Sequence, residues 1–221
     1  MNTMAATSSQ ATGLVGARSP RLDRLRAAAR SPGEASFFFW DANFKNDAVK
    51  VLPGEFFVSD EDMLIVTTLG SCIAACIWDR ERHIGGMNHF MLPEGSGESG
   101  RYGSFAMELL INQLMKRGAS RSTMEAKVFG GGAVIASMTS MNVGERNTQF
   151  VLDYLRTERI PVVSKDVLDV CARKVCLLPA SGKALVKRLV PTNADALLAQ
   201  ERAAAEKAAP QAAGGGSVDL F

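Results

Sequence analysis

The chain has 221 residues, of which 47% are hydrophobic, and its 25 basic side chains nearly balance 23 acidic ones. This composition excludes disorder of the whole chain and predicts one globular domain with tails. A net charge of +2 is too small for a nucleic-acid footprint over the whole fold. The apolar stretches at 72–78 and 128–136 fall short of the roughly 18 residues that a membrane span needs, so we expect neither nucleic-acid binding nor membrane insertion.

The chain carries four cysteines and has no secretory hydrophobic segment at its N-terminus. This usage is typical of reduced thiols in a reducing compartment. We therefore expect a cytoplasmic protein without disulfide bonds.

The composition divides the chain into three parts. Residues 1–35 are rich in Ala, Ser and Arg and lack sustained apolar periodicity, which predicts a flexible N-terminal arm. Residues 36–192 include short apolar runs that alternate with Gly and polar turns, as in a folded domain. Residues 193–221 begin with an Ala-rich segment that predicts a helix, and they end in a flexible tail after three consecutive glycines.

Within the domain, the pattern predicts strands interrupted by two helices. The first helix covers 105–117 behind a Ser104 N-cap and ends at a glycine. The second includes residues 150–155 and stops near 160, where a proline follows. Residues 174–189 predict a β-hairpin with a central Ser-Gly turn.

The segment 67–92 carries the strongest candidate for chemistry and predicts two antiparallel strands joined by a charged turn. If residues 79–82 form the loop, Trp78 pairs with His83 and all partners have numbers that sum to 161. Cys72 then faces His89. Directly opposed residues have Cβ atoms about 4.5 to 5.5 Å apart, so the imidazole would reach the thiol. A slip of one residue would turn His89 to the other face.

A cysteine beside a histidine suits acyl-transfer chemistry. The imidazole takes the thiol proton, and the thiolate attacks an amide carbonyl. His89 would then protonate the departing amine, and water would hydrolyse the thioester. Backbone N–H groups near Gly70, Ser71 and Cys72 are candidate oxyanion donors. In the alternative interpretation, Cys72 is a small buried hydrophobe, and this segment alone leaves both interpretations open.

No metal or cofactor site is expected. Cys72 and Cys76 would lie about 13 Å apart along a strand, and Cys171 and Cys176 would face opposite ways, which argues against a shared zinc ion. We assign Cys76, Cys171 and Cys176 to the core. The triplet Gly130–Gly132 lacks the Lys and hydroxyl of a phosphate loop, which leaves a tight turn or the close approach of a ligand backbone.

Four segments occur in an order that is more specific than any one of them. They are Leu69–Cys72, Gly85–Pro93, Lys127–Ala133 and Gly144–Asn147. Together they resemble the CheD family of chemoreceptor glutamine deamidases over about residues 51–190.

The resemblance implies an enzyme that hydrolyses the side-chain amide of selected glutamines on methyl-accepting chemotaxis receptors, with glutamate and ammonia as products and no cofactor. It also implies Cys72 as nucleophile, His89 as general base and a threonine that orients the histidine. Thr67 is favoured for that role and Thr68 is the second choice. The fold implied is mixed α/β, with two packed mixed sheets flanked by helices, similar to bacterial toxin-type cysteine deamidases.

The partners implied are the cytoplasmic portion of the receptors and, from some relatives, a CheC-type phosphatase. The region 166–173 lacks a glycine pair that many relatives have, which bears on any partner surface built there. Two alternatives stay open. One is a cysteine amidohydrolase that acts on a small amide or a peptide bond, and the other is a non-enzymatic chemotaxis adaptor in which Cys72 is buried.

Overall fold

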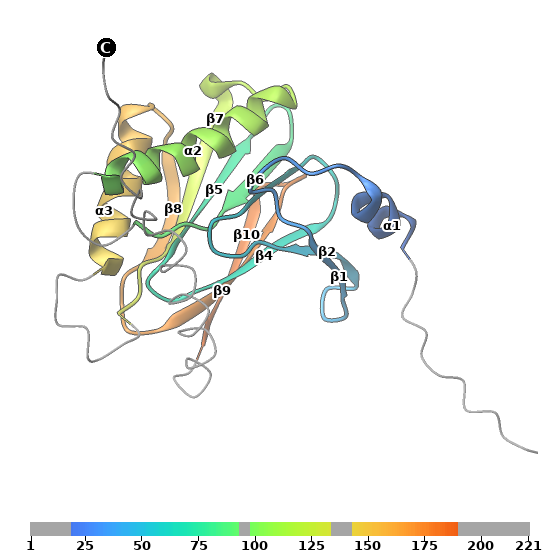
Figure 1. Cartoon of the computed structure of the whole chain (residues 1–221), viewed down its shortest axis with the longest axis horizontal. Coiled ribbons are helices and arrows are strands. Elements are labelled where there is room, and N and C mark those ends of the chain that lie inside the picture. Colours follow the sequence, from blue (N-terminus) through green and yellow to red (C-terminus); the bar gives the residue numbers. More distant parts are fainter. Residues whose placement is uncertain (1–18, 93–97, 134–142, 190–221) are drawn as a thin grey trace, which may run out of the picture.

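A computed structural model describes residues 19–92, 98–133 and 143–189 (Figure 1). Residues 1–18 of the expected arm and the whole predicted C-terminal segment 193–221 lie outside the described residues.

The described strands form two five-stranded sheets. In spatial order, the first consists of β1 (Phe37–Asp41), β2 (Asn46–Lys50), β4 (Leu64–Leu69), β9 (Ala172–Leu178) and β10 (Lys183–Leu189), and the second of β3 (Phe56–Ser59), β6 (Ile84–Asn88), β5 (Ile73–Asp79), β7 (Met124–Gly130) and β8 (Val162–Val167). Each sheet contains one parallel pair, β2 with β4 and β7 with β8, among antiparallel neighbours. The expected fold of two mixed sheets is confirmed, and so is the hairpin of β9 and β10.

Strand β5 shows how the layers are arranged. Its residues Ile73, Ala75 and Ile77 join a core cluster with α2 (Glu98–Lys116) and α3 (Val143–Thr157), whereas Ala74 and Cys76 join a cluster with the first sheet. Alternate residues of a strand point to opposite faces, so the second sheet is buried on both sides. Figure 1 shows both helices over the outer face of this sheet. The long described helices thus flank one sheet rather than both.

Helix α2 begins seven residues before the position predicted from the sequence. It starts at Glu98, so Ser104 lies inside the helix and is not its N-cap. A Cβ at Gly103 would overlap the Phe150 ring of α3 and Leu92. The glycine therefore lets the two helices approach closely. The predicted end is correct, because Gly118 has φ +97° just after the last turn.

The expected flexible arm differs from the structure over residues 20–35. Pro20–Ala27 form helix α1, and Leu22 is buried in the core between the sheets. Arg21 pairs with Asp47 at 3.5 Å, and Arg24 pairs with Glu61 at 2.6 Å. The arginines that indicated a solvated arm are used to bind this segment to carboxylates of the domain.

The loop between β4 and β5 carries the chain from the first sheet to the second and contains Gly70, Ser71 and Cys72. Its three consecutive carbonyl oxygens all accept hydrogen bonds. The Gly132 N–H donates to Gly70 at 2.7 Å, the Gly131 N–H donates to Cys72 at 2.8 Å, and the Asn147 side-chain amide donates to Ser71 at 2.9 Å. These bonds fix the peptide planes of the loop.

The glycine triplet after β7 makes this contact possible. A Cβ at Gly130 would overlap the Cys72 carbonyl oxygen, and one at Gly131 would overlap the Thr148 hydroxyl. Both glycines also have positive φ, +110° and +67°. The sequence left open a turn or the approach of a ligand backbone, and the backbone that approaches is the chain's own.

A buried arginine holds the loop after β8, which is hydrogen-bonded to the glycine triplet. Arg173 on β9 is fully buried and binds Asp166 at 2.9 Å and the carbonyls of Leu168 and Cys171. The Leu168 N–H in turn donates to Gly130 at 2.8 Å. Leu168 and its neighbour Asp169 have φ of +64° and +71°, a conformation that favours glycine. Here, in the region that lacks the glycine pair, side-chain bonds hold the loop in this conformation.

Asp79 organises the turn between β5 and β6. It is fully buried, and its carboxylate accepts hydrogen bonds from the N–H groups of Glu81 at 2.9 Å, Arg82 at 3.0 Å and Ser120 at 2.7 Å. Burial alone would raise the pKa of Asp79, but these bonds and one from Thr123 hold the pKa below its ordinary value.

We predict that Asp79→Asn lowers the free energy of unfolding at pH 7 by about 1 to 3 kcal/mol, because the amide cannot accept the same set of N–H bonds. The depressed pKa means that this stabilisation is present above the unfolded-state pKa of about 4 and is lost as the pH falls further. Urea denaturation at pH 7, 5 and 3.5 should show the difference from wild type shrinking at the lowest pH. Asp60→Asn, at an exposed carboxylate that pairs with Arg117 at 4.0 Å, is the control and should change stability by less than about 0.5 kcal/mol. A difference that is constant with pH would contradict this account.

A second prediction concerns the support under Cys72. Gly130→Ala should lower the free energy of unfolding by about 2 kcal/mol more than Gly118→Ala. Both positions have positive φ, but a Cβ at Gly118 would meet nothing within 4 Å, so the control carries the backbone strain without the overlap. Chemical denaturation of the two variants measures the difference, and equal losses would mean that the Cys72 carbonyl does not need the glycine.

Candidate active site

Cys72 lies where the chain passes between the two sheets. Its side chain is fully buried and belongs to the core cluster between the sheets, with Leu69, Ala74 and Phe129. The loop that carries it is held by the bonds from the glycine triplet and from Asn147. The sequence pointed to Cys72 but not to Asn147, which was noted only as part of a motif.

Asn147 also connects this loop to the segment that follows His89. It is fully buried on α3, donates to the Ser71 carbonyl, and accepts from the Leu92 N–H at 2.9 Å. One side chain thus ties both chain segments of the candidate site to a helix. A polar residue at a buried helical position is the signal that could have identified it.

The predicted pairing register of β5 and β6 is wrong by two residues. Trp78 pairs with Gly85 and Asp79 with Ile84, so partner numbers sum to 163 and the loop is 80–83. Asp79 stays in the ladder because its carboxylate holds the N–H groups of the turn, and His83 completes the turn with φ +56°. These turn contacts were not visible in the sequence pattern.

A shift by two residues keeps Cys72 and His89 on one face. The ladder ends in a bridge between Ile73 and Phe90, joined by two N–H to carbonyl bonds of 2.9 Å. Cys72 and His89 each precede a member of this bridge, so both point to the opposite face from Ile73 and Phe90. They are diagonal rather than directly opposed, a relation in which Cβ atoms are about 7 to 8 Å apart or less.

The backbone of His89 is fixed by the loop before β3. Its N–H donates to the Glu55 carbonyl at 2.9 Å, and its carbonyl accepts from the Gly54 N–H at 2.7 Å. Beside it, Asn88 turns its side-chain amide toward β5 and α2, accepting from Ala75 at 3.0 Å and donating to Ala106 at 3.1 Å. The histidine therefore sits on a rigid junction of three elements.

Thr67 on β4 reaches His89 across the space between the sheets. Its hydroxyl oxygen is 2.8 Å from His89 Nδ1 and 2.8 Å from the Val51 carbonyl oxygen, and both side chains are buried. The carbonyl can only accept, so the single hydroxyl proton goes to Val51. The Nδ1–H then donates to Thr67, and Nε2 is the nitrogen that can take a proton. Thr68, the second choice, is the next residue of the strand and so faces the opposite way.

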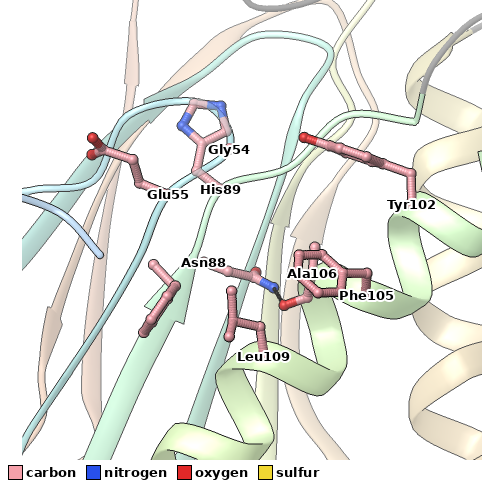
Figure 2. A pocket seen from close by; sticks show the side chains of 9 residues that line it. Gly54, Glu55, Asn88, His89, Tyr102, Phe105, Ala106 and Leu109 are labelled. Atoms are coloured by element: carbon pink, nitrogen blue, oxygen red, sulfur yellow. Dashed lines mark hydrogen bonds between the residues drawn. The ribbon is translucent and has the colours of Figure 1, made fainter. Parts of the chain in front are cut away.

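A pocket lies beside the histidine, between α2 and the strands β3 and β6. Its volume is about 110 Å³, the space of a few water molecules. Figure 2 shows His89 at one side and Tyr102 of α2 at the other, with Asn88 bonded to Ala106 below. The lining residues are Gly54, Glu55, Phe56, Asn88, His89, Tyr102, Phe105, Ala106 and Leu109.

The sequence assigned the other three cysteines to the core. Burial raises the pKa of Cys76 far above its ordinary value and raises the pKa of Cys176 to about 11. Both lie in core clusters, as predicted. Cys171 is half-buried in the loop after β8, so its assignment to the core is wrong.

The described ranges hold no group of three or more His, Cys, Asp or Glu side chains placed to bind one metal ion. None of the described helices combines the length and the apolar character that crossing a bilayer requires.

Known proteins resemble this chain closely. Residues 91–188 match the CheD family model, described as CheD chemotactic sensory transduction. The probable chemoreceptor glutamine deamidase CheD 1 of Albidiferax ferrireducens is 61% identical over 95% of this chain and 91% of its own length. The protein of the same name from Dechloromonas aromatica is 56% identical over 74% and 84%, and the probable chemoreceptor glutamine deamidase CheD of Thiobacillus denitrificans is 52% identical over 85% and 96%. Because the Albidiferax ferrireducens protein is 61% identical over nearly the full length of both chains, this chain belongs to the CheD family.

Proposed function

We propose that this chain hydrolyses the side-chain amide of selected glutamines on the cytoplasmic portion of chemoreceptors, leaving glutamate and releasing ammonia. The names of its relatives support the substrate. The observation that carries the chemistry is the hydrogen bond between Thr67 and His89 Nδ1, because it leaves Nε2 as the basic nitrogen on a histidine that shares a strand face with Cys72.

In the proposed reaction, Nε2 of His89 takes the thiol proton, and the Cys72 sulfur attacks the carboxamide carbon. The tetrahedral intermediate collapses when the imidazolium returns the proton to the nitrogen, so that ammonia leaves and a thioester remains. His89 then takes a proton from water, which attacks the thioester. Its breakdown gives the glutamate carboxyl group and restores the thiol. One water is consumed for each ammonia released.

The loop 70–72 is suited to stabilise the negative charge of the intermediate. The N–H of a trans peptide points away from the preceding carbonyl. Because the carbonyls of Gly70 and Ser71 are bonded to the glycine triplet and to Asn147, the N–H groups of Ser71 and Cys72 point to the other side of the loop. Donors held in advance at such positions stabilise an oxyanion without reorganisation.

A threonine in the orienting position has a physical consequence. Its neutral hydroxyl fixes the tautomer and direction of the imidazole, as a carboxylate would, but stabilises the imidazolium less. The Thr67 proton is committed to Val51, so the oxygen can accept from Nδ1 but cannot donate to it. The orientation of His89 is therefore set by both sheets.

The partners follow from the family. Chemoreceptors are the proposed substrates, and the site of action is the cytoplasm. A CheC-type phosphatase stays a prediction of the resemblance alone.

We predict that Cys72→Ser folds normally but loses deamidation by at least about a thousandfold, because a hydroxyl is a far weaker nucleophile than a thiolate under the same base. Purified protein is incubated with chemoreceptor cytoplasmic fragments, and mass spectrometry scores the mass gain of amide-to-acid conversion at each glutamine. Cys171→Ser is the matched control and should keep wild-type activity, since Cys171 is a half-buried residue of the loop after β8 and has no part in the proposed reaction.

The same assay decides between the alternatives. Cleavage of the receptor chain would indicate a peptidase. Wild-type protein that binds the fragments without changing their mass would indicate an adaptor. Full deamidation by Cys72→Ser would remove Cys72 from the mechanism.

A further inference from the structure

Tyr102 faces the candidate active site from helix α2. It lines the pocket with His89, and Figure 2 shows its hydroxyl directed across the pocket toward the side where His89 and Gly54 lie. The hydroxyl oxygen is 3.7 Å from the position that a Cβ on Gly54 would occupy, and the Gly54 N–H is bonded to the His89 carbonyl. The phenol therefore ends close to the backbone that fixes the histidine.

Two further observations connect Tyr102 to the chemistry. Burial raises the pKa of Tyr102, and the electrostatic interaction with Cys72 raises this pKa further. The phenol therefore stays protonated at neutral pH. None of the hydrogen bonds between described residues uses its hydroxyl. A donor that is half-buried, protonated and directed into a pocket can bind a polar group that enters it.

The pocket suits the end of a glutamine side chain. Phe56, Phe105 and Leu109 offer apolar walls to methylene groups, and Phe105 is 63% exposed at the surface of the molecule. His89 and Tyr102 offer polar groups at opposite sides of the same space. A carboxamide has both a hydrogen-bond acceptor and donors, so it can bond to a phenol while its nitrogen faces the imidazole.

We infer that Tyr102 is a further catalytic residue, whose hydroxyl hydrogen-bonds to the scissile carboxamide of the glutamine and holds it against His89. The inference rests on the proposed function and assigns a substrate contact to α2, an element that the resemblance linked to no site residue. Two other roles make different predictions. A packing role needs only the ring, and a bond to the sulfur would change the reactivity of Cys72 itself.

The test compares Tyr102→Phe with Tyr154→Phe. These are the two tyrosines of the chain, and Tyr154 lies on α3 with its ring against Phe150 and its hydroxyl buried without a hydrogen-bond partner among the described residues. Each variant is made in the full-length protein with Cys171→Ser. Two quantities are measured: kcat/KM for deamidation of a receptor cytoplasmic fragment, and the rate at which methyl methanethiolsulfonate, a small neutral thiol reagent without an amide, blocks Cys72. Cys72→Ala, tested in parallel, sets the background of both measurements.

We expect Tyr102→Phe to lower kcat/KM by about tenfold or more, the effect of losing one hydrogen bond to the substrate, and to leave the rate of thiol blocking within about twofold of wild type. Tyr154→Phe should match wild type in both measurements. An unchanged kcat/KM in Tyr102→Phe would overturn the inference in favour of packing, and an equal fall in both measurements would overturn it in favour of a bond to sulfur. If wild type and Cys72→Ala fail alike to deamidate, the proposed function falls and this inference with it.

Discussion

The hydroxyl of Thr67 joins the two sheets at the one place where chemistry is expected. It accepts a hydrogen bond from the Nδ1–H of His89, which follows β6 in the second sheet. It donates a hydrogen bond to the carbonyl of Val51, which follows β2 in the first sheet, the sheet that also contains Thr67. Both bonds are buried, so water does not compete with them. The orientation of the imidazole therefore depends on the packing of one sheet against the other, and a change in that packing would alter the orientation of His89.

The cysteine is positioned by a second set of contacts, made to the backbone of its loop. Three consecutive carbonyls of its loop accept hydrogen bonds from the glycine triplet and from Asn147. The glycine triplet is bonded in turn to the loop that the buried Arg173 holds. The side chain of Cys72 meanwhile lies in the core cluster between the sheets. The contacts of the loop also explain why a small residue is needed at position 130, far from Cys72 in the sequence but in contact with its oxygen.

The sequence predicted the features that depend on hydrophobic periodicity and on residues that end helices or form turns. Alternation along the strands gave the correct faces of Cys72 and His89, and Gly118 correctly marked the end of α2. The pairing register failed because Asp79 retains the turn through side-chain bonds that no periodicity reveals. Ser104 failed as a helix start because α2 already begins at Glu98, and Gly103 within it allows close packing against Phe150 of α3. The roles of Asn147 and Tyr102 depend on tertiary contacts between elements distant in the sequence, and local sequence patterns do not reveal such contacts.

Nitrogen NMR of histidine-labelled protein shows whether Thr67 holds the proton of His89 on Nδ1. The chain has two histidines, so a His83→Gln variant assigns the signals of His89 without ambiguity. Nδ1 of His89 should carry a proton throughout the pH range in which the protein is folded, and Thr67→Val, which removes the accepting oxygen, should relax this preference. A neutral His89 with its proton on Nε2 in the wild-type protein would rule out this role of Thr67, because that nitrogen could not then act as the base toward Cys72.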